Sequence, residues 1–323
     1  MGKNVLLKKT LHLTVLIPVF ILIFVFTAAA SAGEGSIELK PHWKQGAKKK
    51  FEIIKNRKKV GEGKVLFDGT GRTDLEISVE KADSQGYLVN WTMGETKFDQ
   101  ADAAKNPIAK QAANLLKGFA ILLEVSPSGE LKGVKNWEEL KSKATEALNA
   151  MAEVWRKSGF NEQMISQLNA QVSSTFATKE EITRMCTREP NLYFMTLGRT
   201  YKAGEPLTYD TLLPNPFGGE AFPATGSFVV ARYDKESGKA EVEWNQKIQP
   251  EAAKRVLSAT LKKLGGEQGK NIKEDLLPKN YKIEDSGKFV IDVPSGWVLS
   301  LTQSRTVMTE SASQTDSTTI REK

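Results

Sequence analysis

The chain has 323 residues, a formal net charge of +7, one cysteine and two histidines. Its content of 40% hydrophobic and 26% charged residues is typical of a globular protein, which excludes a disordered chain and a protein with many membrane spans. A single cysteine excludes an internal disulfide and a thiolate zinc site.

Residues 1–32 are predicted to be a secretory signal peptide. Three lysines precede an apolar run from Leu13 to Phe26, and Ala30-Ser31-Ala32 provides the small residues of a cleavage site. The alternative is an uncleaved membrane anchor formed by residues 13–31. We expect an exported protein, periplasmic or secreted, in which residues 33–323 form a single domain.

The positive charge belongs partly to this signal. It contains three lysines and no acidic residue, so its removal lowers the formal charge from +7 to +4. A small charge and an export signal both argue against nucleic acid as a partner.

Residues 48–98 are predicted to form antiparallel strands with one solvated face, because apolar residues recur there mostly at even spacing. Asn106-Pro107 predicts the start of a short helix, with the proline at its first position. A strand over residues 119–125 follows, and Ser126 to Gly129 predicts a turn into the next strand.

Residues 136–187 are predicted to be a central helical insert. Asn136 and Glu139 have the spacing of a capping box at the start of the longest helix. A second helical run contains Leu168. A third begins at Thr178, where Glu181 provides another cap pattern, and it is expected to end before Pro190.

Strand character returns at Leu192. A loop rich in proline and glycine covers residues 213–226, a hairpin follows over residues 228–248, and Gln249-Pro250 predicts another helix. Residues 266–280 are polar and expected to be a loop. Two further strands cover residues 289–293 and 298–308. The Ser/Thr-rich residues 311–323 are expected to be either an edge strand or a frayed tail.

These elements predict an α+β fold with one large curved, mainly antiparallel sheet that resembles a half-barrel. Residues 48–135 and 192–310 share an order of strand, proline-started helix, strand and Pro-Ser-Gly turn. This similarity indicates an internal duplication flanking helices 136–187, or else only the frequent use of such helices and turns.

In this order of elements the chain resembles the Lol-type lipoprotein carriers and related periplasmic lipid-binding proteins, and it is similar to exported bacterial proteins of unknown function. The resemblance covers most of residues 48–308 and includes no diagnostic motif. It differs from the carriers in having no lipobox cysteine and a longer helical insert. It implies a half-barrel whose concave face is covered by helices and holds a lipid.

We therefore predict a non-catalytic binding or carrier protein for an apolar or amphiphilic ligand, such as a lipid or acyl chain. The chain would lie between the sheet and helices 136–187, and entry would require the loop 213–226 or the helices to move. The candidate ligand-binding residues are Phe119, Ile121, Leu123, Met151, Trp155, Leu168 and Phe289. The same apolar pattern is equally typical of a filled core.

A basic run is the strongest charge feature, and it consists of Lys48, Lys49, Lys50, Lys55, Arg57, Lys58 and Lys59. One interpretation is a positive rim that contacts a membrane surface or an envelope protein. The other is a solvated strand whose lysines prevent aggregation between sheets.

The pattern of reactive residues argues against catalysis. His42 is the only histidine after the predicted signal, and Cys186 has no visible base near it in sequence. No metal-binding motif is present, so we expect no metal and no cofactor. The alternatives to a carrier are a structural or protein-interaction module of the envelope and, more remotely, a carboxylate-dependent hydrolase.

Overall fold

A computed structural model describes residues 35–99, 114, 117–174, 176–215, 220–264 and 281–323. The predicted signal peptide, the helix expected at Asn106-Pro107 and the loop 266–280 lie outside these residues. Among the described residues, no helix is long and apolar enough to cross a membrane.

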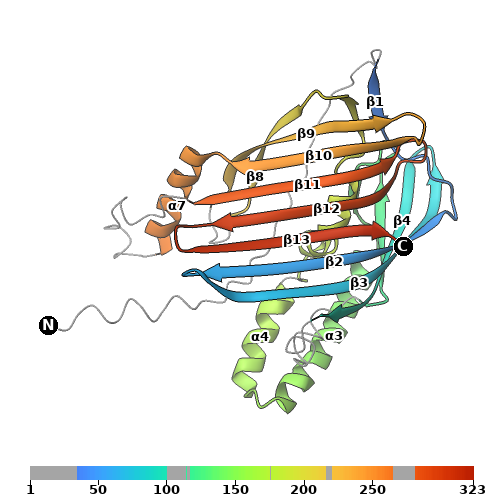
Figure 1. Cartoon of the computed structure of the whole chain (residues 1–323). Coiled ribbons are helices and arrows are strands. Elements are labelled where there is room, and N and C mark those ends of the chain that lie inside the picture. Colours follow the sequence, from blue (N-terminus) through green and yellow to red (C-terminus); the bar gives the residue numbers. More distant parts are fainter. Residues whose placement is uncertain (1–34, 100–113, 115–116, 175, 216–219, 265–280) are drawn as a thin grey trace.

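One antiparallel sheet of eleven strands dominates the molecule (Figure 1). Its spatial order is β6-β5-β4-β3-β2-β13-β12-β11-β10-β9-β8, which confirms the predicted α+β fold with a large antiparallel sheet. The strands of the first half are β2 (Lys48–Gly61), β3 (Lys64–Asp83), β4 (Gly86–Phe98), β5 (Ala120–Val125) and β6 (Leu131–Val134). Those of the second half are β8 (Leu207–Leu213), β9 (Phe222–Asp234), β10 (Lys239–Ile248), β11 (Lys282–Asp292), β12 (Trp297–Met308) and β13 (Ala312–Glu322).

Strand β13 lies inside the sheet, between β12 and β2. The expectation of an edge strand or a frayed tail for residues 311–323 was therefore wrong. Eleven residues of β13 pair with β2, from Ala312 opposite Gly61 to Glu322 opposite Phe51. Its partner lies more than 250 residues earlier in the chain, and local composition carries no signal for such a distant pairing.

The helical insert comprises α3 (Trp137–Lys157), α4 (Glu162–Ser174), α5 (Lys179–Cys186) and α6 (Arg188–Phe194). Thr178 caps α5 as predicted, accepting a hydrogen bond from the backbone amide of Glu181. Asn136 does not cap α3, because its side chain instead bonds the backbone of β5 at Leu122 and Ala120. The third helix also divides at Thr187, so that Pro190 lies in the first turn of α6, where the absence of an amide proton is tolerated.

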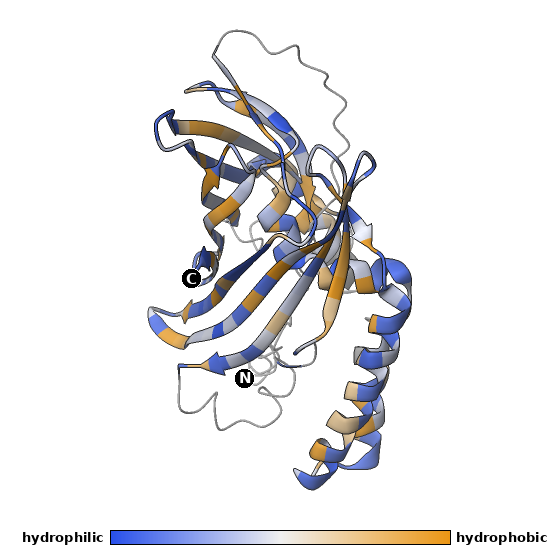
Figure 2. Ribbon diagram, turned by 90° about the vertical axis from the view of Figure 1, so that its right-hand side faces the viewer, coloured by the Kyte–Doolittle hydropathy of each residue, from blue (hydrophilic) through white to orange (hydrophobic). Residues whose placement is uncertain are grey.

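The core lies on one face of the sheet, which we call the inner face. Apolar and polar residues alternate along several strands, as the bands of colour in Figure 2 show, and strand geometry places successive side chains on opposite faces. Helices α3 to α6 all contribute buried residues to the main core, and α3 and α4 form a hairpin that extends beyond the sheet (Figures 1 and 2). Helix α7 (Pro250–Leu264) encloses a second, smaller cluster with β8 to β11. A separate two-stranded sheet joins β1 (Ser36–Leu39) to β7 (Arg199–Lys202).

A glycine in β9 controls how the inner face packs. A Cβ atom at Gly226 would lie 2.3 Å from Cζ of Tyr209, because the tyrosine ring crosses this strand. We expect Gly226→Ala to lower the free energy of unfolding by about 1–3 kcal/mol, the usual cost of overpacking a core.

Urea unfolding of Gly226→Ala beside Gly133→Ala tests this expectation. Gly133 lies in edge strand β6 with nothing within 4 Å of an added Cβ atom, so that its substitution should change stability little. Equal stability of the two variants would contradict the crowding described here.

Candidate functional site

A row of polar side chains crosses the inner face between the two apolar clusters. The strand registers place seven residues opposite one another in turn, six of them polar and one a glycine, and we call this row the polar ladder. From β8 to β2 its members are Tyr209, Gly226, Gln246, Asp285, Arg305, Asp316 and Arg57. Burying a polar group costs free energy unless the group is hydrogen-bonded, so the buried polar members of the ladder require partners.

Asp285 is the centre of the ladder and its side chain is 0% exposed. Its carboxylate accepts two hydrogen bonds from Arg305, each at 2.7 Å, in a bidentate pair. It accepts two more from the amides of Gln246 at 3.1 Å and Gln303 at 3.3 Å. Burial alone would lower the pKa of Arg305, but the hydrogen bonds and charge of Asp285 raise it.

Two aromatic residues extend this network toward β8. The Tyr209 hydroxyl donates to Oε1 of Gln246 at 3.0 Å and accepts a hydrogen bond from Nε1 of Trp244 at 2.5 Å. Burial raises the pKa of Tyr209 to about 12. The tyrosine reaches both partners because Gly226, in the intervening strand, leaves its ring free space.

Toward β2 the ladder becomes exposed. Arg57 donates to Asp316 at 2.5 Å and 3.3 Å, and the Arg57 side chain is 39% exposed. Next to it on the inner face, Lys55 pairs at 2.5 Å with Glu189 of α6. Burial would raise the pKa of Glu189, but the charges of Lys55 and Arg188 lower it. The inner face therefore changes from a buried network at β11 to an accessible cationic surface at β2.

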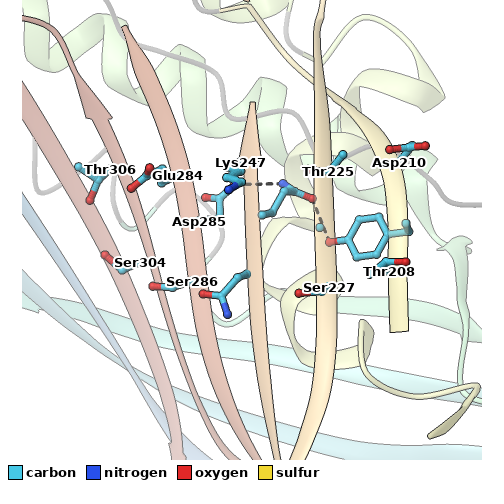
Figure 3. A pocket seen from close by; sticks show the side chains of 14 residues that line it. Thr208, Asp210, Thr225, Ser227, Lys247, Glu284, Asp285, Ser286, Ser304 and Thr306 are labelled. Atoms are coloured by element: carbon cyan, nitrogen blue, oxygen red, sulfur yellow. Dashed lines mark hydrogen bonds between the residues drawn. The ribbon is translucent and has the colours of Figure 1, made fainter. Parts of the chain in front are cut away.

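The opposite face of the sheet carries a trough of about 720 Å³ over strands β8 to β12 (Figure 3). Ten of its lining residues have side chains on this outer face by strand alternation, and they are Thr208, Asp210, Thr225, Ser227, Asn245, Lys247, Glu284, Ser286, Ser304 and Thr306. The other four are Tyr209, Gly226, Gln246 and Asp285, so the trough lies directly behind the ladder. No apolar side chain lines it on the outer face, and it suits hydroxyl-rich or charged groups rather than an acyl chain.

The seven candidate ligand-binding residues all belong to the main core or pack against it. Five are buried, and Phe119 and Leu168 are partly buried. They come from β5, α3, α4 and β11 and from residue 119, and none of them lines the trough. Whether they bind a ligand stays a prediction, and an acyl chain would have to displace existing packing to reach them.

Strand alternation divides the basic run between the two faces of β2. Lys49, Lys55, Arg57 and Lys59 share the inner face with buried Phe51, whereas Lys48, Lys50 and Lys58 lie on the outer face. Four of the seven form ion pairs, with Glu76, Glu322, Glu189 and Asp316. The run is not one continuous rim, and its contact with a membrane or an envelope protein stays a prediction.

The reactive side chains are dispersed. Within the residues that the structure describes, no group of three or more His, Cys, Asp and Glu side chains is arranged to hold a metal ion. Cys186 is buried, and burial together with the charge of Glu189 raises its pKa to about 12. A thiol with so high a pKa is a poor nucleophile near neutral pH.

Sequence reasoning missed the ladder because its members are far apart in the chain. A usable signal existed in two strands. Gln246 falls midway between the inward residues Trp244 and Ile248, and Asp285 lies two residues after the inward Ile283 and four before the inward Phe289. A polar residue at an inward position marks an exception to the apolar pattern, although it does not reveal its partners.

Comparison with known proteins gives little guidance. No protein-family model matches the chain, and no curated protein matches it in sequence. A solved structure of lipovitellin, concerned with its lipid–protein interactions, aligns at a TM-score of 0.39 and 7% identity. The alignment covers 87% of this chain and 25% of that one, and a likeness this loose carries no argument about function. The resemblance to Lol-type carriers stays a prediction.

The Asp285–Arg305 pair provides a test of the ladder. Asp285→Ala leaves a buried guanidinium without its carboxylate, and we expect the free energy of unfolding to fall by about 3–5 kcal/mol. Replacing both partners, as Asp285→Leu with Arg305→Met, should recover much of the loss. In the control Lys288→Met, which removes the exposed pair with Glu243, the loss should be at most about 1 kcal/mol. Similar losses for Asp285→Ala and the control would refute the buried network.

Cys186 predicts a dependence of stability on pH. The unfolded thiol ionises near pH 8.5, whereas the folded thiol keeps its proton up to a pKa of about 12. Stability is therefore lost as pH rises above about 8.5, by up to about 1.4 kcal/mol per pH unit. Unfolding free energies at several pH values, compared between the wild type and Cys186→Ala, isolate this contribution. Parallel pH profiles of the two proteins would contradict the raised pKa.

Proposed function

We propose that the protein is an exported, non-catalytic binding protein or carrier for an amphiphilic ligand with an anionic headgroup. The observation that carries this proposal is an accessible part of the inner face, which we call the inner strip, on strands β3, β2, β13 and β12. Its accessible cationic and apolar members include Arg57, Lys59 and Phe67, and they are flanked on β12 by Val307 and by the largely buried Arg305.

The strip combines the two chemistries of an amphiphile at close range. One cross-strand row contains Arg57 and Arg305, and the next contains Phe67, Lys59 and Val307. Neighbouring rows on one face are separated by two residues, or about 7 Å. An anionic headgroup over the first row would therefore leave its apolar chain beside the second.

Arg57 has donors to offer such a headgroup. A guanidinium carries five N–H donors, and two of those of Arg57 go to Asp316. Fixed by Asp316 and partly exposed, Arg57 is positioned to bind a carboxylate or phosphate without reorganising. An acyl chain that continues toward the seven core residues would require helices 136–187 to separate from the sheet.

The non-catalytic part of the proposal is supported by the state of the buried acid. Asp285 accepts four hydrogen bonds, two of them from Arg305, and its side chain is 0% exposed, so its oxygens are occupied by other side chains of the protein. Export is supported by the sequence of residues 1–32.

A second candidate function, an envelope structural or interaction module, is favoured by the polar trough. Its charged residues Asp210, Lys247 and Glu284 border short hydroxyl side chains, a lining that suits a polar partner. This candidate predicts an unliganded inner face and salt-sensitive association.

Native mass spectrometry of protein recovered from a bacterial host, with organic extraction, tests the proposal first. We expect a co-purifying lipid, or uptake of added fatty acid or phosphatidylglycerol. The double variant Arg57→Gln/Lys59→Gln should weaken uptake at least about tenfold, equivalent to about 1.4 kcal/mol. The matched control Lys48→Gln/Lys58→Gln removes the same charge from the outer face of the same strand and should leave uptake unchanged. An apo mass without uptake would favour the interaction module instead.

A further inference from the structure

The hairpin between β2 and β3 ends in an apolar tip. Val65, Leu66 and Phe67 follow one another in β3 and are 58%, 69% and 43% exposed. Three consecutive exposed apolar residues are unusual on a soluble protein unless they contact something. The turn before them contains Glu62 and Gly63, both with positive φ.

A register shift makes the tip apolar on both faces. The pairing of β2 with β3 shifts between Lys59 and Val60, so that Val65 lies opposite Val60 and Phe67 opposite Lys59. Because Lys59 and Val60 are consecutive, Val65 and Phe67 point to opposite sides of the hairpin. A flat protein surface would cover only one of these sides, whereas a fluid medium that surrounds the hairpin covers both.

The neighbouring hairpin extends the same surface. Met308, at the end of β12, is 38% exposed. Ala312 pairs with Gly61, and the Glu62 amide donates to the Ser311 carbonyl at 2.8 Å. The two hairpin ends are thus joined, and we define the apolar finger as Val65, Leu66, Phe67 and Met308.

The charges around the finger are of both signs. Four lysines and three acids border it, and they are Lys58, Lys59, Lys64, Lys282, Glu62, Asp68 and Glu310. A zwitterionic headgroup layer also presents both charges, so this border is complementary to it and does not favour a strongly anionic or cationic partner. Lysine stems can lie along apolar groups while their ammonium groups stay in water.

We propose that the apolar finger inserts into the interfacial region of a lipid bilayer and docks the sheet at a membrane surface. Insertion would be driven by burial of apolar side chains, with little contribution from net charge. Phe67 belongs both to the finger and to the inner strip, so docking would bring the strip to the membrane. The inference does not depend on the ligand proposed above, because membrane binding is measured without one.

Co-sedimentation with phosphatidylcholine vesicles tests the proposal, using the exported protein with its intact mass recorded. We expect binding that changes little between low and high salt and little on addition of phosphatidylglycerol. The triple variant Val65→Ser/Leu66→Ser/Phe67→Ser should bind at least tenfold more weakly. In the control Leu207→Ser/Leu212→Ser, which replaces exposed apolar residues of β8, binding should be unchanged. Circular dichroism and thermal unfolding establish that each variant is folded.

Tryptophan fluorescence at the finger tests insertion directly. The indole introduced by Leu66→Trp should add fluorescence that is blue-shifted by vesicles and quenched by brominated lipid, relative to the wild type. Equal vesicle binding by the triple variant and the wild type, or an unquenched indole, would overturn the proposal. So would a dimer that the triple variant abolishes while vesicle binding is absent, because the finger would then be an interface between copies of the chain.

Discussion

The pairing of β13 with β2 is the interaction on which the rest of the molecule depends. The first half of the chain forms one set of neighbouring strands, from β2 outward to β6, and the second half forms another, from β13 outward to β8. These two sets meet at the β2–β13 seam in the large sheet. Without the pairing of β2 with β13 the inner face would be divided in two, and Arg57 would have no Asp316 opposite it.

Because side chains alternate between the two faces along each strand, the two faces of one sheet can have different chemistry. On the inner face, apolar clusters and the polar ladder alternate along the strand direction, and α5, α6 and α7 cover the apolar parts. On the outer face, the residues between these positions form a trough of short polar side chains. A change in the register of one strand would exchange the two surfaces over that strand, so the ladder and the trough depend on the same pairing.

The sequence predicts local features of this molecule better than distant ones. The strands over residues 48–98, the helical insert and the Thr178 cap follow from short-range patterns, and the structure contains them. The central place of β13 depends on β2, more than 250 residues away, and composition cannot encode that choice. Asn136 is a second example of a contact that local sequence does not predict. Its spacing to Glu139 fits a capping box, but its side-chain amide hydrogen-bonds the backbone of β5 instead. The partners within the ladder could not be predicted for the same reason, since its polar residues are brought opposite one another only when the strands are aligned.

The seam has a consequence for folding. β2 pairs with β3 across a tight turn, but the partner on its other side comes from the far end of the chain. β2 is therefore an unpaired edge in any partly folded chain in which β13 is not yet in place. Unpaired edges attract other chains, and lysines are a common protection against this. The basic run lies on this strand, and four of its seven residues form ion pairs in the finished sheet. Before β13 is in place, Lys49 lacks Glu322 and Arg57 lacks Asp316, so these unpaired cations would repel a second copy of the same edge.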